Sequence, residues 1–158
     1  MTTPPGSIRI VPEPLTSAVA QGLIATLNAE LSARYPEEGA THFRLDEDEL
    51  APGRGVFVVI YRGDDPIGCG AVRRTGDTVG ELKRMFVAPP ERGHGVGQQL
   101  LAALESEARR LGVQRLVLET GTRQHAAIAL YERAGFERVP AFGEYVGSPL
   151  SVCMAKVL

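Results

Sequence analysis

The fold is decided by residues 80–111, which read GELKRMFV (80–87), APPE (88–91), RGHGVG (92–97) and QQLLAALESEARRL (98–111). The first segment is typical of a β-strand, and two consecutive prolines end it. Glycines then stand at every second position from 93 to 97. Apolar side chains recur after them at three- and four-residue spacing, which predicts an amphipathic helix. The pattern therefore predicts a strand, a proline break, a glycine loop and a helix.

The glycine loop has the composition of an anion-binding site. Glycines have no side chains to keep an anion away from the backbone, and the positive end of the predicted helix lies directly behind them. Arg92 can add a charge-assisted hydrogen bond. Alternate glycines are equally consistent with a tight turn, so this alternative stays open for the loop taken by itself. The position between a strand and a helix favours a phosphate-bearing ligand.

Two common phosphate-binding motifs fit this loop poorly. A P-loop needs a lysine directly after its glycines, whereas the next lysine here is Lys156. The dinucleotide fingerprint needs a third glycine where Gln98 stands, although Glu119 lies roughly where its ribose-binding acid would. Five residues, two of them prolines, also separate Val87 from Gly93, so a tight strand-to-helix turn is missing. A dinucleotide-binding oxidoreductase is therefore disfavoured.

The loop resembles that of the GNAT superfamily of acyl-CoA-dependent N-acyltransferases. The family's pyrophosphate motif, Gln/Arg-x-x-Gly-x-Gly/Ala, corresponds to Arg92-Gly93-His94-Gly95-Val96-Gly97. A second family element, Ala-x-x-x-Tyr-x-x-x-Gly-Phe, corresponds to residues 127–136, with Tyr131 as its tyrosine. At the usual asparagine position of the family this chain has Gln124 or His125. The two motifs follow each other in family order, and the resemblance is closest over residues 56–136.

The expected fold is α+β, a single N-acetyltransferase domain over residues 1–158 with a mixed, mostly antiparallel central sheet of about six to seven strands and helices on both faces. Turn signals between residues 61 and 78 predict hairpins, whereas the helix after residue 97 makes strands 78–87 and 115–119 parallel. In the resembled family these two strands, the fourth and fifth, splay apart around the pantetheine arm. The patterns predict strands at 8–11, 56–61, 67–73, 78–87, 115–119, 136–139 and 151–157, and further helices around 19–31 and 124–134.

The resemblance implies acetyl-CoA as the cosubstrate. The three histidines, His42, His94 and His125, have no metal-ligand spacing, so no metal is expected. The cofactor-binding residues that the resemblance implies are the backbone groups of Met85, Phe86 and Val87, the loop residues Arg92, Gly93, His94, Gly95, Val96 and Gly97, and the side chain of Gln124.

Glu81 is the candidate catalytic base. An alkyl ammonium group has a pKa of ~10.4, so a nearby group must accept its proton before the nitrogen can attack. Several members of the resembled family place a catalytic carboxylate at this strand position. Strand alternation predicts that Glu81 shares a face with Lys83, Met85 and Val87. The alternative is a carboxylate paired with a lysine or arginine of a neighbouring strand.

Tyr131 is the candidate catalytic acid, which would protonate the departing thiolate. The phenol pKa of ~10 lies above the thiol pKa of ~8.5, so the transfer needs hydrogen-bond contact. The alternative is a core aromatic residue on the apolar face of its helix. A backbone N–H near Met85 to Val87 would polarise the carbonyl oxygen. Direct transfer needs no acyl-enzyme, so neither Cys69 nor Cys153 is required, and both are expected to be small core residues.

Composition limits the partners and the compartment. The net charge of −2 gives no basic footprint for nucleic acid, and no apolar run approaches the ~18 residues of a membrane span. The N-terminus lacks the layout of a signal peptide. We therefore expect a cytoplasmic protein without nucleic-acid or membrane partners. A homodimer is left open, because apolar surface patches cannot be located from the sequence.

Two segments are candidates for the acceptor site. Residues 35–52 are rich in acids, and in the resembled family this region forms a second helix and a loop beside the acceptor, where acids could attract a cationic amine. A solvated helix face is the alternative. Tyr35, His42 and Phe43 are ambiguous in the same way. Phe142 and Tyr145, in a Gly- and Pro-rich linker, could line the pocket or pack in the core.

The favoured function is an acetyl-CoA-dependent N-acetyltransferase that acts on a primary amine of a small molecule or a protein by direct attack in a ternary complex. The alternative from another class is a non-catalytic acyl-CoA-binding sensor or interaction domain. The presence of both Glu81 and Tyr131 favours the enzyme. The identity of the acceptor and the length of the acyl chain are not readable from the sequence.

Overall fold

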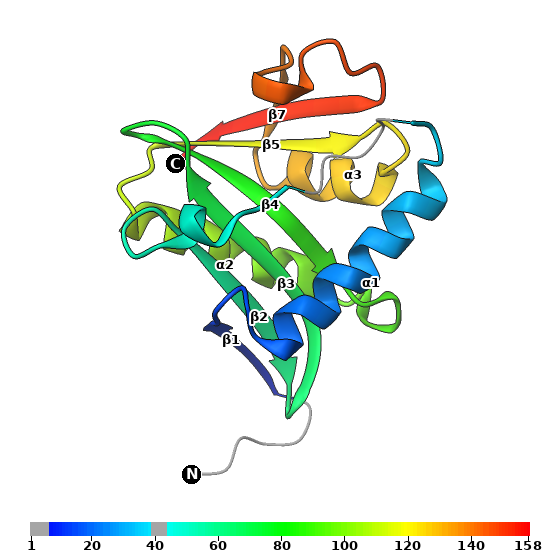
Figure 1. The fold of residues 1–158 in the computed structure, drawn as a ribbon, viewed down its shortest axis with the longest axis vertical. Helices are drawn as coiled ribbons and strands as arrows, with labels where there is room; N and C mark the ends of the chain where they lie inside the picture. Colours follow the sequence, from blue (N-terminus) through cyan, green and yellow to red (C-terminus); the bar gives the residue numbers. More distant parts are fainter. Residues whose placement is uncertain (1–6, 39–43) are drawn as a thin grey trace.

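The computed structural model describes residues 7–38 and 44–158, so His42 and Phe43 lie outside the described residues. Within these described ranges, seven strands form one sheet, and three α-helices pack on it (Figure 1). In chain order the elements are β1 (Ile8–Pro12), α1 (Ala18–Arg34), β2 (Gly55–Arg62), β3 (Asp65–Arg74), β4 (Val79–Val87), α2 (Val96–Arg110), β5 (Arg115–Gly121), α3 (His125–Arg133), β6 (Glu137–Val139) and β7 (Ser151–Val157).

The order of the strands in the sheet is β1-β2-β3-β4-β5-β7-β6. Neighbouring strands are antiparallel except β4 and β5, which α2 connects and which run parallel. The expected mixed, mostly antiparallel sheet is therefore confirmed, and so are the hairpins that argued against a dinucleotide fold.

Helices cover both faces of the sheet (Figure 1). On one face, Leu23 and Leu27 of α1 pack with Phe57, Ala71 and other residues of the strands. On the other face, apolar side chains of α2 and α3 pack against β2, β4, β5 and β7. The four-residue spacing of leucines that predicted α1 and α2 thus marks the buried face of each helix.

A few boundaries differ from the predicted ones. β5 continues two residues beyond 119 to Gly121, and α3 is one residue shorter at each end than 124–134. The linker 140–149 contains a single 3-10 turn, Gly143–Tyr145. Between residues 35 and 54, the described part contains only a 3-10 turn, Glu47–Leu50, in place of the α-helix that the resemblance implied.

The fourth and fifth strands splay apart, as expected. The pairing of β4 with β5 covers four residue pairs and ends at Leu82 and Leu118. Beyond this point β4 continues to Val87 and β5 to Gly121 without pairing with each other. The sheet is therefore split at the carboxyl ends of its two parallel strands.

A β-bulge lies in β4 at the start of this split. Ala71 of β3 pairs with Lys83, and Cys69 pairs with Phe86. Between these two pairs, β4 therefore contains one residue more than β3, which defines the bulge. Arg84 has a φ of 56°, a left-handed conformation that favours glycine. The bulge corrects the predicted alternation: Glu81 and Lys83 share a face with Phe86, and not with Val87.

None of the helices in residues 7–38 and 44–158 combines the length and the apolar composition that crossing a bilayer requires.

Candidate functional site

A cavity of about 840 Å³ lies between α1, the end of β4, the N-terminus of α2 and α3. This volume is in the range of sites that bind drug-sized or cofactor-sized ligands. Among the residues that line it are eight of the ten predicted cofactor-binding residues, Met85, Phe86, Val87, Arg92, Gly93, Gly95, Gly97 and Gln124.

The two remaining predicted residues, His94 and Val96, are not among the lining residues. His94 is exposed on the loop, and Val96 is buried against Ile60 and Ile67. The side chain of Phe86 also packs into the core on the α1 side, so its backbone is the part that can face a ligand.

The glycine loop requires glycine for its backbone conformation. Gly93 and Gly95 have φ values of 81° and 80°, and Gly95 caps the N-terminus of α2 without a side chain. A Cβ atom at either position would meet nothing within 4 Å, so conformation and not crowding selects glycine. The N–H groups of the first turn of α2 have no partners within the helix, as at any helix start. These donors suit a phosphate group.

Four arginines line this cavity and give it a positive charge. Arg34, Arg92, Arg123 and Arg133 stand around it, and Glu30 is the only acid among the described residues that line it. Glu30 lies 2.9 Å from the guanidinium of Arg92 and 3.5 Å from that of Arg34. The sequence predicts only Arg92 at this site, because the other three arginines come from helices and a loop that only the fold brings together.

Arg92 ties the loop to its surroundings. Its Nε donates a hydrogen bond of 2.8 Å to the carbonyl oxygen of Val87, and its Nη2 pairs with Glu30 of α1. The glycine loop is thereby fixed to the end of β4 and to α1 at the mouth of the split.

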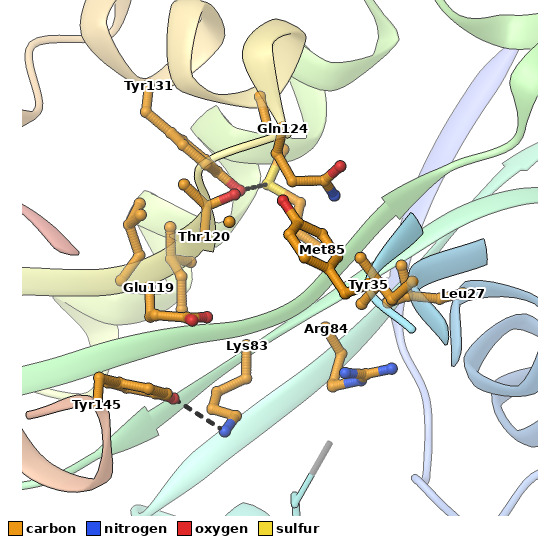
Figure 2. Close-up of a pocket in the computed structure, with 15 residues that line it drawn as sticks. Leu27, Tyr35, Lys83, Arg84, Met85, Glu119, Thr120, Gln124, Tyr131 and Tyr145 are labelled. Carbon is orange, nitrogen blue, oxygen red and sulfur yellow. Dashed lines mark hydrogen bonds between the residues drawn. The ribbon is translucent and has the colours of Figure 1, made fainter. Parts of the chain in front are cut away.

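A second cavity of about 120 Å³ adjoins the first inside the split between β4 and β5 (Figure 2). Leu27, Met85, Gln124, Ala127 and Tyr131 line both cavities, so the two spaces meet there. The polar residues found only in the smaller cavity include Tyr35, Lys83, Arg84, Glu119, Thr120 and Tyr145.

Tyr131 stands where the two cavities meet. Its ring is buried, lies edge-on to Phe136 at 5.7 Å, and its hydroxyl donates to the sulfur of Met85 at 3.6 Å. Burial raises the pKa of the Tyr131 hydroxyl to about 12, with a smaller contribution from Glu119. The hydroxyl is therefore protonated at neutral pH, and its raised pKa makes it a weaker acid than a free phenol.

Glu81 is buried behind the smaller cavity and does not line it. Its carboxylate accepts hydrogen bonds of 2.7 and 3.1 Å from Arg73 of β3 and one of 2.7 Å from the hydroxyl of Tyr145. The pairing with an arginine of a neighbouring strand, which the sequence left open as the alternative, is present. Tyr145, which does line the cavity, contacts Glu81 with its hydroxyl.

Glu119 is the carboxylate that lines the smaller cavity. It directly follows Leu118, the last residue of β5 that pairs with β4, and it accepts a hydrogen bond of 2.5 Å from Ser151. Burial raises the pKa of Glu119 to about 7, although Ser151 and Lys83 act in the opposite direction. The sequence indicates this residue only as a ribose-binding acid of the disfavoured dinucleotide motif. An acid at the end of a predicted parallel strand was the signal that could have identified it.

Two cations also face the smaller cavity (Figure 2). Lys83 lies 3.3 Å from the hydroxyl of Tyr145 and 3.9 Å from the carboxylate of Glu144. Arg84 donates a hydrogen bond to Asn28 of α1. Burial lowers the pKa of both side chains.

The described acids of residues 35–52 do not line either cavity, although Tyr35 of the same segment lines the smaller one. Glu37 pairs with Arg123, Asp46 with Arg44, and Glu49 with Arg73. None of the acids at residues 37, 38 and 46–49 lines the cavities. Of the two linker aromatics, Tyr145 lines the smaller cavity and Phe142 packs edge-on against it at 5.4 Å.

The two cysteines are core residues, as expected. Cys69 and Cys153 are buried and not disulfide-bonded. Burial raises the pKa of the Cys69 thiol to about 12, so a thiolate nucleophile is disfavoured there.

Comparisons with known proteins agree with this fold and site. The model of the Acetyltransferase (GNAT) family matches residues 21–136. An IAA acetyltransferase of Azospirillum brasilense is 43% identical over 146 residues, which are 92% of this chain and 94% of that protein. A crystal structure from Klebsiella pneumoniae, described as that of an acyl-CoA N-acyltransferase, has a TM-score of 0.84 and 38% identity and covers 97% of this chain and 99% of its own.

A more distant structure shares the fold. A GNAT family acetyltransferase from Elizabethkingia anophelis with acetyl-CoA bound has a TM-score of 0.68 and 19% identity, and the match covers 96% of this chain and 98% of that one. The family match extends over β2 to β5, the glycine loop and the tyrosine helix described above. The chain therefore belongs to the GNAT family of acetyltransferases.

Proposed function

We propose that this acetyltransferase moves the acetyl group of acetyl-CoA directly to a primary amine while both substrates are bound. The observation that carries the proposal is the pair of cavities that meet at Tyr131. The larger one has the glycine loop and arginines suited to phosphates, and the smaller one has a carboxylate suited to deprotonating an amine. Acetyl transfer in the named relatives supports the same chemistry.

The residues of the larger cavity fit acetyl-CoA, which supplies the reactive thioester when bound. The first turn of α2 and its glycine loop offer N–H groups for the pyrophosphate, and Arg34, Arg92 and Arg123 offer positive charge. The split between β4 and β5 gives room for an extended arm, with the backbone of Met85 to Val87 along one side. Gln124, at the start of α3, lies where the family has its asparagine.

The bulge of β4 supports the proposed polarisation of the carbonyl oxygen. Arg84 and Met85 lie between the paired residues Lys83 and Phe86, outside the regular ladder with β3. Backbone N–H groups released from a ladder can point toward a ligand. Such donors stabilise the negative charge that develops on oxygen during acyl transfer.

We propose Glu119 as the group that takes the proton from the attacking amine. It lines the cavity, and its pKa of about 7 suits a base that works near neutral pH. Glu81 stays a prediction for the same role. A proton from the amine would reach its carboxylate only through the hydroxyl of Tyr145, which contacts Glu81. Tyr131 stays the proposed acid, supported by its protonated hydroxyl at the junction of the cavities.

A non-catalytic acyl-CoA sensor is not favoured. The named relatives are acetyltransferases, and both a carboxylate and a phenol face the junction where transfer would occur. We further propose that residues 1–158 work as a single domain in the cytoplasm, a setting consistent with two buried cysteines that are not disulfide-bonded. Fractionation of cells that express the tagged chain tests this location, and recovery in the membrane or exported fraction would contradict it.

Steady-state release of free CoA thiol tests the proposed reaction. With acetyl-CoA and the acceptor amine varied together, direct transfer predicts intersecting double-reciprocal lines. Parallel lines would instead indicate an acyl-enzyme and contradict direct attack.

Replacement of Tyr131 tests its proposed role in the same assay. Tyr131→Phe should lower kcat by about 10- to 100-fold while leaving the affinity for acetyl-CoA within about threefold, because only the hydroxyl is lost. The control is Phe142→Leu, which alters a partly buried aromatic residue that lines neither cavity. An unchanged kcat in Tyr131→Phe would remove the hydroxyl from the mechanism.

A further inference from the structure

Lys83 and Arg84 are consecutive in the sequence, yet both line the smaller cavity on the α1 side of the sheet. Consecutive side chains of a regular strand point to opposite faces. The bulge and the left-handed backbone of Arg84 remove this alternation, so that Arg84 contacts Asn28 of α1. Lys83 contacts the hydroxyl of Tyr145 (Figure 2). The chain thus adopts a conformation disfavoured for a non-glycine residue and concentrates two positive charges in one small space.

Both cations are buried deeply. Lys83 is 6% exposed and Arg84 is 8% exposed, and a buried charge is costly unless an opposite charge or a set of hydrogen bonds compensates it. The carboxylate of Glu144 lies 3.9 Å from Lys83, on a half-exposed side chain. Glu81 is already engaged by Arg73 and Tyr145. The cavity wall therefore carries more positive than negative charge, with Glu119 as the only carboxylate among its described lining residues.

The polar groups of the cavity are arranged in two sets. Glu119 extends from β5 below Tyr131 and Thr120, whereas Lys83 and Arg84 extend from β4 on the opposite side (Figure 2). One set can accept hydrogen bonds and a proton from an amine. The other can donate hydrogen bonds to an anion.

We propose that the acceptor is a small amine that carries an acidic group, a carboxylate or a phosphonate, a few bonds from its nitrogen, and that Lys83 and Arg84 bind this anion while Glu119 faces the nitrogen. This inference rests on the proposed function and names the substrate class of the same site. The volume of about 120 Å³ agrees with a small acceptor. A lysine side chain of a protein has no anion near its amine that could contact Lys83 and Arg84.

Matched acceptor pairs test the inference with the full-length chain and acetyl-CoA. Alanine and phenylalanine are compared with alaninamide and phenylalaninamide, which keep the shape and remove the charge. A second arm compares 2-aminoethylphosphonate with propylamine and so distinguishes a phosphonate from a carboxylate. We expect kcat/KM for the acidic member of at least one pair type to exceed that of its neutral partner by about tenfold or more.

The variants Lys83→Met and Arg84→Gly remove one charge each, and glycine tolerates the backbone of residue 84. Each should raise the KM of the acidic acceptor by about tenfold or more, raise that of the neutral partner much less, and leave the KM of acetyl-CoA nearly unchanged. Arg54→Met is the matched control, because Arg54 is exposed and lines neither cavity. A thermal shift with acetyl-CoA verifies that each variant is folded.

The outcomes separate this inference from the proposed function. Equal or faster transfer to the neutral partners, or transfer to no member of any pair by a protein that binds acetyl-CoA, would overturn the acidic acceptor. Variants that weaken acidic and neutral acceptors alike would overturn the role of Lys83 and Arg84. A protein that fails to bind acetyl-CoA at all would contradict the proposed function itself.

Discussion

Glu81 and Glu119 lie on the same face of neighbouring strands, but they have different surroundings. Glu81 pairs with Val117 in the sheet register, so alternation along β5 puts Glu119 on the face of Glu81. Arg73 and Tyr145 donate hydrogen bonds to the carboxylate of Glu81. Glu119 accepts one hydrogen bond from Ser151 and faces the cavity. The ion pair suits a structural carboxylate, and the cavity position suits a base.

Replacement of each carboxylate by its amide separates the two roles. Glu119→Gln should lower kcat/KM by about 100-fold or more, the usual scale of general base catalysis. Glu81→Gln should act mainly on stability, because it weakens a buried pair with Arg73. Initial rates and urea unfolding measure both effects, with the exposed Glu137→Gln as the control. A loss of activity confined to Glu81→Gln would return the role of base to Glu81.

The pH dependence of the reaction follows from the environment of Glu119. A base must be deprotonated to accept a proton, and burial raises the pKa of Glu119 to about 7. With saturating acetyl-CoA, kcat/KM for the acceptor should therefore rise with pH and have a midpoint near that value. A second rise should follow as the acceptor ammonium group itself loses its proton. In Glu119→Gln the lower step should disappear, and its persistence would assign it to another group.

The elements of the site differ in how far the sequence predicts them. The helix α2 and its glycine loop follow from apolar spacing and from alternate glycines, and both are where the pattern put them. The bulge in β4 is different, because its residues Lys83-Arg84-Met85 contain neither glycine nor proline. No residue type in this segment predicts the left-handed backbone of Arg84. Strict alternation therefore wrongly placed Met85 and Val87 on the same face as Glu81.

The left-handed conformation of Gly95 in the glycine loop should be needed for binding of acetyl-CoA. Gly95→Ala puts a side chain on a residue with a φ of 80°, which should cost about 1–2 kcal/mol or shift the start of α2. The affinity for acetyl-CoA should fall in either case, as measured by titration calorimetry. Gly22→Ala is the matched control, because Gly22 lies exposed inside α1 with open space around it. That change should raise stability by about 0.5–1 kcal/mol and leave the affinity unchanged. Tight binding by Gly95→Ala would show that the loop conformation is dispensable.

At the scale of the molecule, the split between two parallel strands creates the site. The resemblance of two motifs predicted the splayed strands, and the sheet confirms them because pairing of β4 with β5 ends at Leu82 and Leu118. The acceptor cavity could not be predicted in the same way. Its wall joins Tyr35 after α1, Glu119 at the end of β5 and Tyr145 from the linker before β7, which are distant in sequence and share no motif.

The charge of the acceptor cavity also arises only at this scale. The sequence suggested that the acids of residues 35–52 attract a cationic amine, but none of those that the structure describes lines either cavity. Glu37, Asp46 and Glu49 pair with Arg123, Arg44 and Arg73. The smaller cavity is instead lined by two cations, Lys83 and Arg84. The negative charge of residues 35–52 therefore did not predict the charge of the acceptor cavity.

The most direct test of the central claim is a thermal-shift comparison of acetyl-CoA, free CoA, NAD and ATP. A ligand at about a hundred times its dissociation constant stabilises the folded state by about 2.7 kcal/mol, which at this chain length raises the Tm by about 5–11 °C. The two-cavity site predicts this shift for acetyl-CoA and CoA and little or none for NAD and ATP. No shift with acetyl-CoA, or a larger one with NAD, would contradict the assignment of the glycine loop and the split sheet to an acyl-CoA.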